Sequence, residues 1–160
     1  MPNRTRSALA AIAAVIMLTC QSGATADPPL TGPTRIIDGD TFDVYSRSGT
    51  VRVRIYGIDT PERGQPGARA ATEALRALLA AGPVTCHPRP GEITHGRVVA
   101  TCTAAGIDVA LQLLLDGLAA PWCSFLAGDP LEPAYLAARG AAVARLPSTA
   151  PALPRHRCPS

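Results

Sequence analysis

The chain has 160 residues, the size of one domain, and a formal net charge of +3 in which every cationic side chain counted is arginine, because the sequence contains no lysine. Beyond residue 26 the net charge is only +1. This balance argues against a broad basic surface of the kind that holds duplex DNA through many phosphates, so any contact with nucleic acid must be local.

The first 26 residues are predicted to be a signal peptide. Two arginines precede an apolar run over residues 8–18, and an A-x-A cleavage site ends at Ala26. The apolar run is too short to span a bilayer, which requires about 20 residues. We therefore expect no stable membrane span and export to the periplasm or the medium. Lipid modification of Cys20 is the competing interpretation.

A linker over residues 27–33 is expected before three short strands. Apolar alternation and flanking turn residues place these strands at 34–37, 41–46 and 50–57. Residues 47–49 join the second strand to the third as a hairpin.

Helical spacing of apolar residues predicts a helix within residues 66–83, which ends at a Gly-Pro pair. Two further strands, at 84–87 and 97–104, are expected on either side of a loop over 88–96.

Two more helices complete the predicted domain. The first spans residues 108–119, where Asp108 can cap the first turn, and the second spans 132–146. The proline-rich segment 147–160 is expected to be an extended tail. Three strands, a helix, two strands and further helices follow the order of a five-stranded OB-fold barrel with three helices, occupying residues 34–146.

Four cysteines follow the predicted leader, an even number that suits an oxidising compartment. They are Cys86, Cys102, Cys123 and Cys158. Three pairings into two disulfides are formally possible. Zinc binding is the rival interpretation, although none of the four forms a CxxC pair.

Two short turns concentrate acidic residues. The first contains Asp38 and Asp40, and the second contains Asp59 and Glu62. Each has a structural explanation, the first as an Asp-Gly turn and the second as a capped helix start. Pairing of the second and third strands can bring Asp40 beside Asp59, and hard oxygen ligands without a nearby histidine or cysteine favour Ca²⁺.

Four motifs in order resemble the staphylococcal-nuclease-like, or thermonuclease, family over about residues 34 to 122. The motifs are IDGDTF, VRIYGIDTPE, HGRVVA and DVALQLLLDGLA. The resemblance implies an OB barrel with three helices and Ca²⁺-dependent hydrolysis of DNA and RNA, leaving 3′-phosphate ends. It also implies that Ca²⁺ is held by the side chains of Asp40 and Asp59 and by the backbone carbonyl of Thr60.

The same resemblance implies that Arg54, Glu62 and Arg97 are catalytic. Glu62 would accept a proton from the attacking water, and the planar guanidinium groups suit bidentate contact with phosphate. His95 is a candidate for stacking on a base or binding phosphate, and Asp38 is expected to support the metal ligands. Few aromatic residues and a short segment after Glu62 leave the choice between DNA and RNA open.

On this scheme the cysteines are expected to form two bridges. Cys86 and Cys102 fall on the strands that flank the Arg97 loop, and Cys123 with Cys158 would tie the tail to the body. We expect a monomer. Two other functions stay open: a catalytically inactive OB module that binds nucleic acid or protein, and an exported metal hydrolase that acts on a different phosphodiester.

Overall fold

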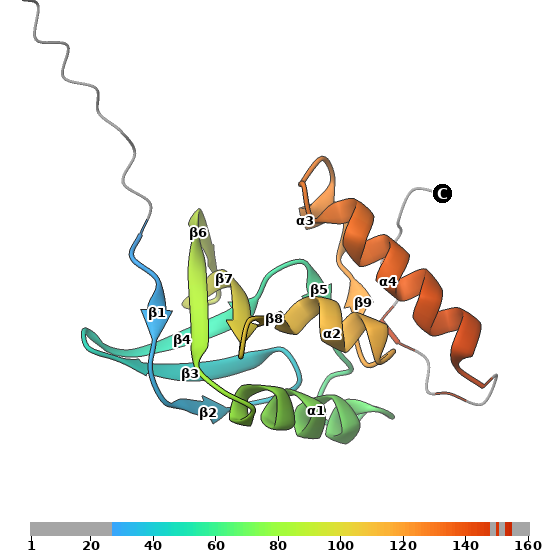
Figure 1. The fold of residues 1–160 in the computed structure, drawn as a ribbon, viewed down its shortest axis with the longest axis horizontal. Helices are drawn as coiled ribbons and strands as arrows, with labels where there is room; N and C mark the ends of the chain where they lie inside the picture. The colour runs from blue at the N-terminus through green and yellow to red at the C-terminus, as the bar shows by residue number, and fades with distance from the viewer. Residues whose placement is uncertain (1–26, 148–149, 151–152, 155–160) are drawn as a thin grey trace, which may run out of the picture.

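The computed structural model describes residues 27–147, 150 and 153–154 (Figure 1). The predicted signal peptide, Cys20, Cys158 and most of the proline-rich tail lie outside the described residues, and their predictions stay predictions. The described part is a mixed α+β fold with one large sheet, one small sheet and four helices.

The main sheet has the order β1-β6-β7-β4-β3-β2, with β8 beside β7. Its strands are β1 (Leu30–Thr31), β2 (Thr34–Ile36), β3 (Thr41–Ser46), β4 (Gly49–Ile55), β6 (Val84–Thr94), β7 (Arg97–Ala104) and β8 (Ile107–Asp108). The pair of β4 and β7 is parallel, and the other pairs are antiparallel. The small sheet pairs β5 (Ile58–Asp59) with β9 (Ala120–Pro121).

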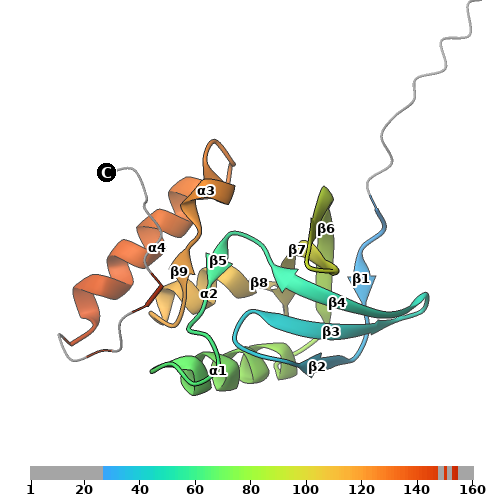
Figure 2. The same ribbon diagram turned by 180° about the vertical axis from the view of Figure 1, so that it is seen from behind.

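The helices are α1 (Ala68–Ala80), α2 (Val109–Leu115), α3 (Cys123–Leu126) and α4 (Glu132–Arg145). In both views α1 runs along the lower edge of the molecule beside β2, and α4 lies at the end beyond α2 (Figures 1 and 2). The core lies between the sheet and the first two helices, where Phe42, Leu75 and Leu113 are completely buried. Within the described ranges, no helix has the length and apolar character needed to cross a bilayer.

The prediction of a mixed fold of strands and helices is confirmed, but a five-stranded barrel with three helices is not. Nine strands and four helices occur in the described residues, and no strand pairing among them closes the main sheet into a barrel. The additional elements β5, β8 and β9 have two residues each and α3 has four. Elements this short cannot be predicted from hydrophobic periodicity.

Two predicted irregular segments are partly strand. The expected linker 27–33 contains β1, which pairs with Thr85 and Cys86 of β6. The expected loop 88–96 is mostly the second half of β6, with a shift of register between Pro88 and Ile93. Because β1 is so short, this half of β6 has no partner on the β1 side in the described sheet, and proline is tolerated on such an edge.

The acidic turn at 59–62 does not start a helix, contrary to its capping pattern. The backbone N–H of Gln65 donates to the carbonyl of Glu62 at 2.9 Å, which closes a turn. Helix α1 begins only after Gly67, whose φ of 91° lies in the left-handed region that glycine adopts without strain. The predicted cap of α2 is confirmed, because Asp108 accepts the backbone N–H of Leu111 at 3.0 Å.

A disulfide joins Cys86 of β6 to Cys102 of β7 at directly paired positions, as predicted. These two cysteines are therefore not zinc ligands. Cys123 is also disulfide-bonded. Because Cys158 lies outside the described residues, its pairing with Cys123 stays a prediction.

The charged face of β3 and β4 depends on one buried carboxylate. Asp43, which is 1% exposed, accepts hydrogen bonds from Arg52 at 2.8 Å and from Arg35 at 2.6 Å. The hydrogen bond from Arg52 is the largest cause of a pKa for Asp43 below the ordinary value. Its ionised form therefore stabilises the fold at pH values above the unfolded-state pKa of about 3.8, and this contribution is lost as the pH falls through the lowered pKa.

We expect Asp43→Asn to lower the free energy of unfolding by about 1–3 kcal/mol at pH 7, because two arginines lose a buried anionic partner. The difference from the wild type should shrink as the pH falls below about 4. Urea denaturation across this range measures both effects. Asp116→Asn, at an exposed position, is the control, and an equal loss in that variant would contradict a special role for Asp43.

Candidate active site

Chain segments at the ends of β3, β4 and β5 meet at one point. Asp40 directly precedes β3, and its carbonyl accepts the backbone N–H of Ile55, the last residue of β4, at 2.9 Å. Asp59 ends β5. The register of the β3–β4 hairpin pairs Thr41 with Arg54, so Arg54 and Asp40 come together through backbone hydrogen bonding. Proximity of Asp40 and Arg54 is thus a consequence of strand register.

Arg54 lies between the two aspartates. Its Nη2 is 3.2 Å from Oδ2 of Asp40 and 3.0 Å from Oδ1 of Asp59. Its Nη1 donates to the carbonyl of Ile55 at 3.0 Å. Because Arg54 and Asp40 are each only 6% exposed, this is a buried ionic cluster in which one guanidinium faces two carboxylates.

Asp40 is the most strongly held member of the cluster. Its Oδ2 accepts from both the backbone N–H and the hydroxyl of Thr60, at 3.0 and 2.9 Å, and its Oδ1 accepts from the hydroxyl of Thr41 at 3.0 Å. Burial raises the pKa of Asp40 to about 6, the nearby carboxylate of Asp38 adds to the rise, and Arg54 opposes it. The aspartate charge is therefore only partly compensated by the protein.

The donor set fits a hard divalent cation. The side chains of Asp40 and Asp59 and the backbone carbonyl of Thr60 offer oxygen ligands of the kind that Ca²⁺ and Mg²⁺ prefer. Among the described residues no group of three or more His, Cys, Asp or Glu side chains is arranged to hold a metal. An ion at this position would therefore depend on water or substrate oxygens as well, and it would share both carboxylates with Arg54.

Every residue that the sequence predicts for the site lines one cavity of about 260 Å³. These residues are Asp38, Asp40, Arg54, Asp59, Thr60, Glu62, His95 and Arg97, and the cavity is completed by Pro61 and Trp122. The structure therefore brings together side chains from both acidic turns, the end of β4 and the turn between β6 and β7.

The remaining candidates differ in how firmly they are held. Arg97 is half-buried, and its Nε donates to the carbonyl of Thr94 at 3.2 Å. His95 is exposed in the turn between β6 and β7 and has a positive φ of 49°. Glu62 is exposed. The backbone N–H of Asp40 donates to Oδ1 of Asp38 at 3.2 Å, so Asp38 supports the turn that carries the first aspartate.

Trp122 is the residue that sequence reasoning missed. The guanidinium carbon of Arg54 lies 5.6 Å from the centroid of its ring, a cation–π distance. Trp122 also packs edge-to-face on Phe125 at 5.0 Å and lines a second hollow beside the first. Its segment has no helical or strand periodicity, and the signal that could have found it is that Trp122 is the single tryptophan of the sequence.

Comparisons with known proteins find relatives that include nucleases. It is 47% identical over 73 residues to micrococcal nuclease from Shigella flexneri, covering 45% of this chain and 41% of that protein. An uncharacterized endonuclease from Escherichia coli is 39% identical over 51 residues, or 32% of this chain and 33% of the endonuclease. The succinoglycan biosynthesis protein ExoI from Rhizobium meliloti is 32% identical over 120 residues, or 68% of this chain and 60% of that protein.

The chain is a mixed α+β protein that resembles nucleases in sequence. Its resemblance to the staphylococcal-nuclease-like family is confirmed by the similarity to micrococcal nuclease and to the endonuclease. No model of a protein family matches the chain. The chain spans from one-third to three-fifths of the length of these relatives.

We expect Ca²⁺ to raise the thermal midpoint of the protein, because an ion held by Asp40 and Asp59 binds only the folded state. At an ion concentration 100 times the dissociation constant, the gain would be about 2.7 kcal/mol. Thermal melts followed by circular dichroism, with Ca²⁺, Mg²⁺ or chelator, measure this shift. Asp59→Asn should abolish it and Asp116→Asn should keep it. An unchanged shift in Asp59→Asn would place the ion elsewhere.

Proposed function

We propose that the chain is an exported, Ca²⁺-dependent endonuclease that hydrolyses phosphodiester bonds of DNA, RNA or both. The observation that carries the proposal is that three aspartates, Glu62 and two arginines line one cavity. The similarity of the chain to micrococcal nuclease supports a nucleic-acid substrate. The signal-peptide pattern of residues 1–26 supports export.

The two arginines supply the charge that phosphodiester hydrolysis requires. The transition state gathers negative charge on the phosphoryl oxygens, and cationic groups fixed in advance stabilise it without reorganisation. Arg54 is fixed by the carbonyl of Ile55, by two carboxylates and by the ring of Trp122. Arg97, at the start of the neighbouring strand β7, is held by the carbonyl of Thr94. Both arginines line the cavity, and we propose that their guanidinium groups contact the same phosphate there.

The acidic residues differ in exposure, because Asp40 is buried, Asp59 is partly buried and Glu62 is exposed. Asp40, Asp59 and the Thr60 carbonyl are the groups that would hold Ca²⁺, which when bound supplies Lewis acidity to a phosphate oxygen. Glu62 lies on the same cavity but is exposed, so its carboxylate can reach a water molecule and accept its proton. We propose that this water attacks phosphorus in line with the leaving 5′ oxygen, which leaves a 3′-phosphate.

We expect Glu62→Gln to reduce turnover by about 10² to 10⁴, because general-base assistance has that magnitude. Purified protein is incubated with DNA and with RNA, in Ca²⁺ and in chelator, and the end groups of the products are determined. Gln65→Ala, in the same exposed turn, is the control for local disturbance. Absence of Ca²⁺-dependent cleavage of either polymer would reject the nuclease and favour a binding module, and near-normal turnover of Glu62→Gln would remove Glu62 from the mechanism.

Trp122 is expected to act as a positioning residue for Arg54. A partly buried cation–π contact contributes about 1–2 kcal/mol, so Trp122→Leu should lower kcat by roughly 5- to 30-fold. Trp122→Phe keeps an aromatic face and should restore most of the loss. If Trp122→Leu and Trp122→Phe have the same kcat, the aromatic ring does not act through the guanidinium group of Arg54.

A further inference from the structure

Arginine side chains line a groove that leads away from the catalytic cavity. Arg63, Arg69 and Arg76 border a hollow of about 280 Å³ between α1 and the segment that follows β5. This hollow shares Asp38 and Pro61 with the catalytic cavity, so the two are adjoining.

The groove continues along α1 to the edge of the sheet. A second hollow of about 530 Å³ shares Arg76 with the first and is also lined by Arg35 of β2. Both ribbon views show the C-terminal end of α1 beside β2 (Figures 1 and 2). We call the two connected hollows the α1 groove, defined by Arg35, Arg63, Arg69 and Arg76.

The α1 groove carries more positive than negative charge, because four arginines line its two hollows against two acids, Asp38 and Glu73. Arg69 pairs with Glu73 at 2.8 Å, but its side chain stays 90% exposed. Within the described part of the chain, Arg63 donates to the backbone carbonyl of Ile37, at 3.4 Å, and forms no ion pair. Arg35 and Arg52 share the single carboxylate of Asp43, so the two arginines are left with one uncompensated charge. Because the chain beyond residue 26 has a net charge of only +1, this excess is local.

The spacing of the charges suits a chain of phosphates. Arg69 and Arg76 are seven residues apart on α1, about 10 Å along the helix axis at 1.5 Å per residue. One phosphate cannot contact both ends of such a row. No aromatic side chain lines either hollow within the described residues, so the groove offers contacts to the backbone of a nucleic acid and none of the stacking that binds its bases.

We propose that the α1 groove binds the phosphate backbone of a polynucleotide beyond the phosphodiester that is cleaved. This inference rests on the proposed nuclease function and adds a sequence-independent site for long substrates. It makes the protein favour polymers over short diesters, because only a polymer reaches from the catalytic cavity to Arg76 and Arg35.

The test compares long and short substrates in a variant with three neutralised groove arginines, Arg63→Gln, Arg69→Gln and Arg76→Gln. With a 30-nucleotide single strand, KM should rise about tenfold or more with kcat unchanged. With a dinucleotide, kcat/KM should not change. Fluorescence anisotropy of the labelled strand in chelator measures binding without cleavage. The slope of log affinity against log salt should fall by about 0.7 for each phosphate that the variant no longer neutralises.

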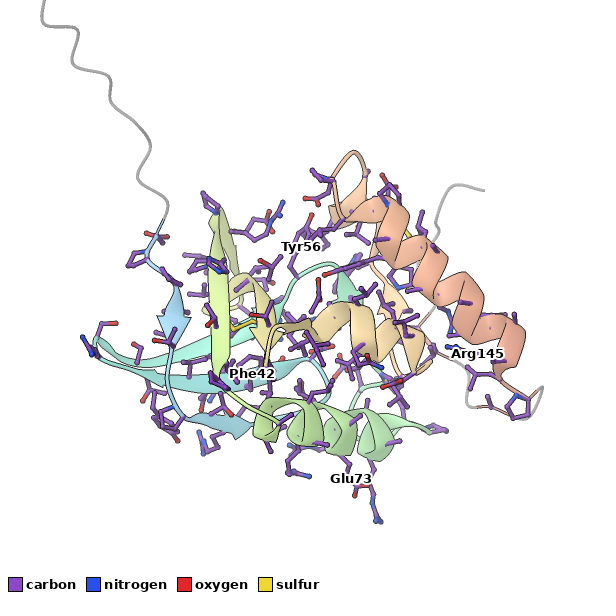
Figure 3. All side chains as sticks on the ribbon, viewed as in Figure 1. Phe42, Tyr56, Glu73 and Arg145 are labelled. Carbon is purple, nitrogen blue, oxygen red and sulfur yellow. A yellow bond between two sulfur atoms is a disulfide. The ribbon has the colours of Figure 1, made fainter. Side chains whose placement is uncertain are left out.

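Two controls separate the groove from general charge. The first control carries Arg47→Gln, Arg139→Gln and Arg145→Gln, so it has the same net charge as the groove variant but alters arginines outside both hollows. One of them, Arg145, lies at the end of α4, far from Glu73 on α1 (Figure 3). This control should bind the long strand nearly as the wild type does. Glu73→Gln removes the acid that pairs with Arg69, and it should tighten binding. Circular dichroism melts establish that each variant is folded.

The outcomes distinguish the two proposals. If the wild type binds the strand and the groove variant does not, but neither cleaves it in Ca²⁺, the nuclease proposal fails and the groove stands. If the wild type cleaves and the groove variant keeps its KM and salt slope on the long strand, the groove proposal is overturned. Equal weakening by the control variant, or no tightening by Glu73→Gln, would overturn it as well.

Discussion

The buried contact of Arg54 with Asp40 and Asp59 is the constraint on which the site depends. Two carboxylates this close to each other repel, and removing them from water is costly unless a cation faces them. Arg54 supplies that cation at 3.2 and 3.0 Å. The burial that makes the cluster costly also strengthens its electrostatic effect on anything bound in the cavity, because a low dielectric reduces screening. Stability and function therefore make opposing demands on this cluster.

The burial of Arg54 follows from the elements that cover β4. The alternation of this strand would leave both Arg54 and Tyr56 on its polar side, yet both are buried. Arg89 of β6 stacks over the Tyr56 ring at 3.8 Å, and the segment after α2 supplies Phe125, whose carbonyl accepts a hydrogen bond from the Tyr56 hydroxyl. Trp122, from the same segment, approaches the guanidinium of Arg54. The cover that completes the fold thus also shapes the cavity.

The sequence predicted which residues come together better than it predicted the fold around them. Proximity of Asp40 and Arg54 is predictable because hairpin register follows from period-two alternation and a short turn, both of which are local signals. The strands β5 and β9 are not predictable in this way, since each has two residues and pairs across a long separation in sequence. The capped helix start that local patterns allow at Asp59 does not occur, because α1 begins only after Gly67. Asp59 accepts a hydrogen bond from Arg54, a tertiary partner that local patterns do not reveal.

The local distribution of charge and the net charge of the chain predict different affinities for nucleic acid. A chain whose charge beyond residue 26 is +1 would be a poor binder of nucleic acid if its arginines were spread evenly among its acids. Here Asp43 holds two arginines with one carboxylate, and Glu73 faces only one of the arginines of α1. Acidic residues elsewhere restore neutrality to the whole. Because electrostatic interactions in salt extend only about 10 Å, a bound strand would respond to the local excess and not to the total.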